Sequence, residues 1–164
     1  MLTRRDLQSI AALAWLPFIL ACDPAAVLPG AWTTVKAEAR RVEIFTDVNL
    51  KEEVQSDKTG TSEAVGSITF VDDGTGTLTA TQLFDPLNVQ YDAADPAIEA
   101  TLEWVLVDSE SPPQLILATS HLEWNGTWII DSASPGQVVL RRLEIIDHSA
   151  QQRSEITTTF MLSR

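Results

Sequence analysis

Residues 68–81 have the sequence ITFVDDGTGTLTAT, and this stretch decides the fold. Two runs in which apolar residues alternate with threonine flank the turn Asp72-Asp73-Gly74. A glycine-containing turn between two alternating runs is a strong β-hairpin signal. Alternation with a period of two places one face of each run against a core and the other toward solvent. The segment therefore predicts two antiparallel strands.

The same pattern recurs along the chain after Cys22. Ser111-Pro112-Pro113 and Ser134-Pro135-Gly136 mark further turns between apolar runs. No segment keeps the i, i+3, i+4 spacing of an amphipathic helix over three turns. The expected strands are residues 31–45, 65–72, 76–84, 100–108, 114–120, 126–132, 137–145 and 155–163.

Sequential strands joined by short turns pair as antiparallel neighbours, and closure of the sheet removes its free edges. We therefore expect an all-β fold, an eight-stranded antiparallel up-and-down barrel, with a sandwich as the alternative. The polar stretches 46–64 and 85–99 are the two long connections. We expect both as loops at the barrel ends, with a short helical turn within 92–99.

The first expected strand changes phase along its length. Val35, Ala37 and Ala39 occupy odd positions, whereas Val42 and Ile44 occupy even positions. A one-residue slip of this kind needs a β-bulge, which bends the strand. We expect the bulge between these two groups, with the three odd residues facing inward.

The N-terminal segment has the features of an export signal. Arg4 and Arg5 precede the apolar run Ile10–Ala21. This run of twelve residues is shorter than the about 20 that a membrane-spanning helix needs, and it suits a signal peptide. A targeting segment therefore precedes the globular domain.

The apolar run ends in Ile19-Leu20-Ala21-Cys22, which resembles the lipobox of bacterial lipoproteins. In that family the chain is cut before the cysteine, which carries the lipid. The resemblance implies a signal peptide over 1–21, a lipidated tether over 22–27 and a domain over 28–164. It also implies a location in the bacterial cell envelope, anchored to a membrane and facing the periplasm or the cell exterior.

Two alternatives concern this segment. A plain secretory peptide followed by an incidental cysteine is the first. The second is export through the twin-arginine route, because residues 3–8, TRRDLQ, also resemble the twin-arginine signal. The general secretory route and the twin-arginine route therefore both stay open.

Residues 28–32, LPGAW, resemble the opening G-x-W motif of lipocalins, with Gly30 and Trp32 at the motif positions. The order seen in bacterial lipocalin-like lipoproteins is also followed by residues 66–70, 73–77, Trp104, 115–117, 127–130 and 138–140. The resemblance covers roughly residues 28–163. It implies an eight-stranded lipocalin-like barrel and a small apolar ligand.

The same resemblance implies how the barrel is closed and where a ligand lies. In lipocalins the motif tryptophan closes one barrel end against a late-strand arginine, for which Arg141 and Arg142 are the candidates here. An eight-stranded barrel is either filled by its side chains or holds one small molecule. Tight packing of large against small residues is the alternative to a cavity. The candidate ligand-contacting residues are the large inward side chains Phe70, Trp104, Leu117, Trp128 and Phe160.

Composition and spacing exclude several classes of function. The 23 acidic and 11 basic residues give a formal charge of −12, which argues against a nucleic-acid partner. The single cysteine excludes an internal disulfide. His121 and His148 have no third ligand at metal spacing, so we expect both on the surface. Since no nucleophile or acid–base motif is present, we expect no enzyme, no cofactor and no metal.

Two functions stay open. The first is a lipid-anchored lipocalin-like module that binds a small apolar ligand. The second is a packed structural or interaction module that docks a protein partner through its loops or acidic surface. A polar residue at a cavity mouth favours the first function, whereas a full, dry interior favours the second.

Overall fold

Each strand pairs with a neighbour along the chain, and the first strand also pairs with the last. The computed structural model describes residues 22–164. These form a short helix, α1 (Pro24–Val27), and nine strands. The strands are β1 (Gly30–Thr46), β2 (Glu52–Ser62), β3 (Gly66–Phe70), β4 (Thr75–Asp85), β5 (Gln90–Val107), β6 (Gln114–Thr119), β7 (Gly126–Ser134), β8 (Gln137–Ser149) and β9 (Gln152–Ser163).

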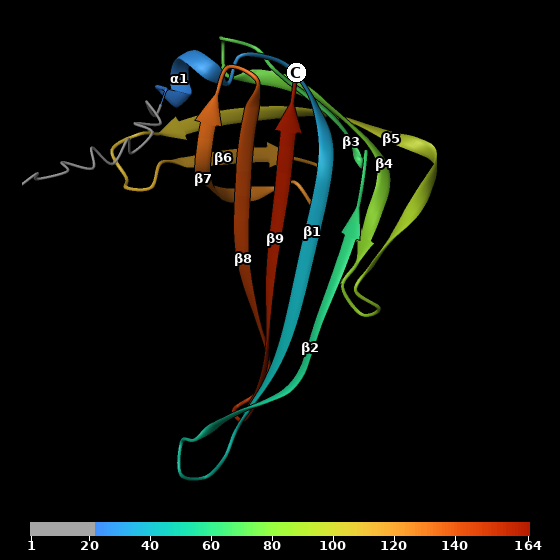
Figure 1. Cartoon of the computed structure of the whole chain (residues 1–164), viewed down its shortest axis with the longest axis vertical. Helices are drawn as coiled ribbons and strands as arrows, with labels where there is room; N and C mark the ends of the chain where they lie inside the picture. Colours follow the sequence, from blue (N-terminus) through green and yellow to red (C-terminus); the bar gives the residue numbers. More distant parts are fainter. Residues whose placement is uncertain (1–21) are drawn as a thin grey trace, which may run out of the picture.

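The sheet has the order β2-β1-β3-β4-β5-β6-β7-β8-β9, and the pairing of β1 with β9 closes it (Figure 1). The described residues therefore form a closed eight-stranded antiparallel barrel with β2 as an additional strand. The expected all-β barrel is confirmed, and the sandwich alternative is wrong. The expected signal peptide, residues 1–21, lies outside the described residues.

β1 is long enough to pair with three other strands, β2, β3 and β9. Its first part, Gly30–Thr34, pairs with β3, and its later part, Ala37–Thr46, pairs with β2. Its other edge pairs with β9 from Thr33 to Phe45. β2, β1, β9 and β8 therefore extend beyond the barrel rim as a twisted four-stranded projection (Figure 1). We call this projection, made of residues 40–46, 52–59, 143–149 and 152–157, the arm.

The two polar stretches expected as loops are largely strand. Residues 52–62 form β2, and residues 90–99 form the first part of β5, so the helical turn expected within 92–99 is wrong. β2 was missed because nearly all its side chains are exposed, and no apolar alternation marks a buried face. The start of β5 was missed because its register against β4 is broken, with Ala80 paired to Ile98 and Gln82 to Ala93.

β1 contains a bulge, but not where the phase of its apolar residues places it. The register against β9 shifts between Thr34 and Lys36. Val35 lies at the shift and is 40% exposed, so its inward assignment is wrong. Thr34 is fully buried in its stead, while Ala37 and Ala39 are buried as expected. The sequence misleads here because the buried residue is the polar threonine and the exposed one is valine.

The middle of the barrel is filled by aromatic rings packed against small residues. Trp124 stacks on Phe160 with ring centroids 4.1 Å apart, and Trp128 lies 5.0 Å from Phe160. Ala37 and Ala39 are fully buried in the same barrel. This interdigitation of large and small side chains is typical of a packed core.

Trp32 closes the end of the barrel that α1 covers. Its ring is buried, and its indole N–H donates to the Leu28 carbonyl over 2.7 Å. The Arg164 guanidinium lies over the Trp32 ring, 4.2 Å from its centroid, and donates to the carbonyls of Val27 and Pro29. Gly30 has φ 124°, a backbone conformation that residues with a side chain rarely adopt, so glycine suits this position.

Neither Arg141 nor Arg142 meets Trp32, so the arginine expected from the lipocalin resemblance is wrong. Arg141 lies on the outer face of β8 and pairs with Asp131, with Nε 2.8 Å from Oδ2. Arg142 lies over the ring of Trp128 at 4.8 Å from its centroid. Arg164 follows the last strand, where no periodicity indicates a direction for its side chain.

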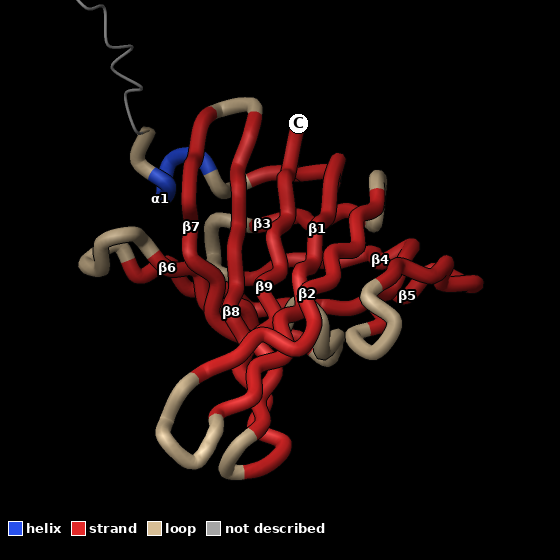
Figure 2. The backbone as a smooth tube through the Cα atoms, turned by 60° about the horizontal axis from the view of Figure 1, so that its bottom comes forward, coloured by secondary structure: helices blue, strands red, loops and turns tan. Residues whose placement is uncertain are grey.

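The expected tether, residues 22–27, contains α1 and packs directly against the barrel (Figure 2). Asp23 caps the helix by accepting from the Ala25 N–H, and Val27 is buried. Cys22 is partly buried against the core. Among residues 22–164, no helix has the length and apolar character needed to cross a membrane.

Trp32→Ala should lower the free energy of unfolding by about 3–5 kcal/mol, because truncation of a large buried ring leaves a cavity. Arg164→Ala should cost about 0.5–2 kcal/mol through the lost cation–π contact. Arg141→Ala is the matched control; it removes only a surface pair and should cost about 0–1 kcal/mol. Equilibrium urea denaturation of residues 22–164 measures all three. A loss below about 1 kcal/mol for Trp32→Ala would contradict the closing role.

Candidate ligand-binding site

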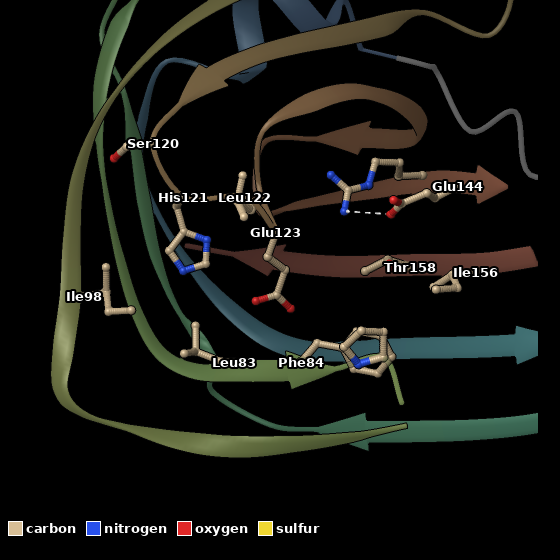
Figure 3. Close-up of a pocket in the computed structure, with 12 residues that line it drawn as sticks. Leu83, Phe84, Ile98, Ser120, His121, Leu122, Glu123, Glu144, Ile156 and Thr158 are labelled. Carbon is tan, nitrogen blue, oxygen red and sulfur yellow. Dashed lines mark ion pairs between the residues drawn. The ribbon is translucent and has the colours of Figure 1, made fainter. Parts of the chain in front are cut away.

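A cavity of about 530 Å³ opens at the barrel end opposite α1, beside the arm (Figure 3). Its walls come from β4 and the turn after it, β5, the loop 120–125 between β6 and β7, β8 and β9. The lining residues are Leu83, Phe84, Pro86, Ile98, Ser120, His121, Leu122, Glu123, Arg142, Glu144, Ile156 and Thr158.

Trp124 anchors the loop 120–125 in the core. Its ring is buried in the core against Phe160, and its carbonyl accepts from the Trp128 indole N–H over 2.8 Å. The backbone N–H groups of Trp124 and Asn125 both donate to the His121 carbonyl. The loop is therefore a tight turn whose inner side is the buried ring of Trp124.

The side walls of the cavity are largely apolar. Leu83 and Ile98 lie on one side, and Ile156 and Thr158 lie on the other (Figure 3). Phe84 lies at the base of the view, and its ring also contacts Tyr91, with centroids 5.2 Å apart. An apolar molecule of moderate size would lose contact with water between these walls.

Two polar side chains of the loop point into this apolar space (Figure 3). His121 is only 8% exposed, and neither of its ring nitrogens has a hydrogen-bond partner within the protein. Oε1 of Glu123 also has none. Each unsatisfied buried polar group costs about 1–3 kcal/mol. Buried polar groups left without a protein partner at such a cost call for a specific explanation, such as an ordered water, an ion or a ligand.

The protonation of both groups follows from their burial. Burial raises the pKa of the Glu123 carboxyl to about 7, while the Phe84 N–H and the Arg142 charge act to lower it. Burial lowers the pKa of the His121 imidazole. Burial therefore favours the neutral form of His121, and Glu123, with a pKa of about 7, is about half protonated near neutral pH. Burial and the charges of Glu123 and Glu38 also raise the pKa of the Tyr91 hydroxyl.

Arg142 is the basic residue of the lining, and its interactions lie within the protein. Its guanidinium covers the Trp128 ring, and Nη1 donates to the Asn125 carbonyl over 2.7 Å. Nη2 lies 4.0 Å from Oε2 of Glu144. Arg142 thus holds the loop 120–125 against β8.

The five side chains expected to contact a ligand lie elsewhere. Phe70, Leu117, Trp128 and Phe160 are buried in the core, and none of them lines the cavity. Trp104 lies half-buried near the closed end, where its indole N–H donates to the carbonyls of Val71 and Thr75. Ligand contact with these residues stays a prediction, and the cavity offers a different place for a ligand.

Sequence reasoning missed the residues that define the cavity. The surface position expected for His121 is wrong. The burial of Trp124 against Phe160 holds the loop against the barrel end, and His121 is buried with it. His148 is exposed as expected, and its Nε2 lies 2.8 Å from the Ser154 hydroxyl. Glu123 was not among the predicted site residues. The tryptophan directly after it, in a short loop between two strands, was a signal for a loop anchored in the core. Within the part of the chain that the structure describes, no three His, Cys, Asp or Glu side chains gather as metal ligands.

No family model, curated protein or solved structure matches the chain. The closed barrel itself therefore defines the class, a small β-barrel with a cavity at one mouth. The likeness to lipocalin-like lipoproteins stays a prediction from short motifs.

Glu123→Gln should flatten the dependence of stability on pH. The folded-state pKa of about 7 lies above the ordinary 4.5, so the folded protein binds this proton more tightly than the unfolded chain. The resulting stabilisation is complete below pH 4.5 and is lost as the pH rises through 7, by no more than about 3 kcal/mol. Urea denaturation from pH 4.5 to 8 measures this loss.

Comparison of variants isolates the Glu123 contribution. His121 acts with the opposite sign, because its lowered pKa removes stability as the pH falls below 6.5. This contribution is present in wild type and in Glu123→Gln, so it cancels in their difference. Glu103→Gln, which changes an exposed carboxylate on the outer face of β5, should follow the wild-type curve. A constant difference between wild type and Glu123→Gln over this range would contradict the raised pKa of the Glu123 carboxyl.

Proposed function

We propose that this protein is a lipid-anchored lipoprotein of the bacterial cell envelope whose barrel binds one small apolar ligand in the cavity beside the loop 120–125. The cavity carries the binding part of the proposal. Its volume of about 530 Å³ lies within the range of about 300–1,000 Å³ for small-molecule sites. Apolar walls with a few convergent polar groups are also typical of such sites.

The sequence supports the anchoring part of the proposal. The apolar run ending in Ile19-Leu20-Ala21-Cys22 precedes the only cysteine of the chain. The acidic body is repelled by anionic lipid surfaces, so attachment relies on acyl chains, which contribute about 0.8 kcal/mol per buried CH₂. Cys22 is partly buried at the closed barrel end, where an attached lipid leaves the cavity mouth free.

Cys22→Ala should abolish lipid attachment and removal of residues 1–21. Mass spectrometry of the full-length product purified from its native membrane should show wild type starting at Cys22 with acyl chains. The variant should keep residues 1–21 and carry no lipid. Asp23→Asn keeps the cysteine and should stay acylated. Cleavage of Cys22→Ala between Ala21 and residue 22 would show an ordinary secretory signal.

Ligand binding is tested with N-phenyl-1-naphthylamine, an uncharged apolar dye whose fluorescence rises in apolar surroundings. Soluble protein spanning residues 22–164, which contains the whole closed barrel, should bind one equivalent saturably. Ile98→Glu places a charge on the apolar wall and should weaken binding at least tenfold. Val105→Glu is the matched control on the outer face of the same strand and should bind as wild type does. Equal binding by both variants would place the dye outside the cavity.

A protein-docking function is the second candidate, and the arm favours it. Val54, Leu143 and Ile145 lie on its outer face, and each is more than half exposed. Apolar side chains on a projecting sheet are typical of interaction surfaces. Failure of wild-type protein to bind the dye would reject the cavity function and leave docking through the arm as the proposal.

A further inference from the structure

We propose that the cavity selects a cationic amphiphile, an apolar molecule with a protonated amine that Glu123 and His121 bind at the loop 120–125. The proposal rests on the proposed function, because it names the class of ligand for the same cavity. It goes further in assigning the head group and the residues that recognise it.

The unpartnered atoms of the loop 120–125 are mainly hydrogen-bond acceptors. An ionised carboxylate only accepts hydrogen bonds, and Oε1 of Glu123 has no donor within the protein. A neutral imidazole offers one acceptor, and both ring nitrogens of His121 are unpartnered. The loop therefore lacks donors above all. A protonated amine supplies up to three N–H donors from one atom.

Arg142, which carries the most hydrogen-bond donors in the lining, is already engaged within the protein. Arg142 donates to the Asn125 carbonyl, covers the Trp128 ring and lies near Glu144. An anionic head group would have to compete for this guanidinium while it faced Glu123 and Glu144. A cationic head group is repelled by the Arg142 charge, which also acts on Glu123, but it is attracted by both carboxylates and does not need the engaged guanidinium.

The acidic character of the protein also favours a cationic ligand. The chain carries a formal charge of −12, which raises the local concentration of cations. Hydrogen bonds between charged partners are about twice as strong as neutral ones, and more so away from water. The apolar walls formed by Leu83, Ile98 and Ile156 would hold the tail. An alkylamine therefore uses both parts of the cavity.

Binding of an amine should depend on pH through Glu123. The groups around its carboxylate are His121 of the same loop, Arg142 and Glu144 of β8 and Tyr91 of β5. Because burial raises the pKa of Glu123 to about 7, only a fraction of the protein carries the charge at pH 6, whereas most of it does at pH 8. Since apparent affinity scales with the competent fraction, it should rise about tenfold between these values.

The test compares octylamine, 1-octanol and octanoate, which share a chain length and differ in head-group charge. Isothermal titration of residues 22–164 at pH 8 should show octylamine binding at least tenfold more tightly than octanol, with octanoate weakest. From pH 6 to pH 8 the affinity for octylamine should rise about tenfold, whereas that for octanol should stay constant.

Two variants assign the effect to Glu123. Glu123→Gln preserves shape and should weaken octylamine binding about tenfold or more, remove its pH dependence and leave octanol binding unchanged. Glu103→Gln, on the outer face of β5, should match wild type throughout. The comparison of the three compounds on wild-type protein needs no variant, so it holds even if Glu123→Gln folds poorly.

The outcomes separate this proposal from the function on which it rests. Equal affinity for the three compounds would overturn the cationic head group and leave an apolar cavity. Tightest binding of octanoate would also overturn it and assign the head group to Arg142. Octylamine binding that is independent of pH in wild type would overturn the role of Glu123. Absence of binding by all three compounds would reject the cavity function itself.

Discussion

The pairing of β1 with β9 is the contact on which the rest of the structure depends. Without it the sheet would be open, and two long strands would present unpaired N–H and C=O groups to water. With it, the apolar faces of the eight barrel strands turn inward and the aromatic rings around Phe160 meet. The bulge at Val35 lies within this pairing. Trp32 and Thr34 face inward before the bulge, and the extra residue lets Ala37 face inward after it.

The loop 120–125 contributes both to the packed core and to the cavity. On one side Trp124 fills the core, and on the other His121 and Glu123 enter the cavity. The favourable burial of a large aromatic ring thus offsets the cost of burying the His121 ring nitrogens and Oε1 of Glu123 without hydrogen-bond partners in the protein. Arg142 connects the same loop to β8, so the position of Glu123 depends on packing inside the barrel.

The barrel could be predicted from the sequence because each barrel strand has one buried face, and this face gives a period of two, as at Ile68 and Phe70. β2 could not be predicted, because it lies outside the barrel and its exposed side chains carry no periodic pattern. The arginine over Trp32 was missed for a related reason, since position in space rather than pattern brings Arg164 there. The candidate site lay beyond prediction because burial gives His121 and Glu123 their properties, and burial of a loop is decided by the tertiary fold.

The attachment of α1 to the barrel has a consequence for orientation. Val27 is buried and Cys22 is packed against the core, so a lipid on Cys22 would leave little slack between membrane and barrel. Such a short and rigid connection between the lipid and the barrel would hold the Trp32 end toward the bilayer, and the cavity would open on the far side. Under that geometry the ligand would enter by diffusion through the aqueous compartment rather than by lateral transfer from the lipid leaflet that carries the anchor.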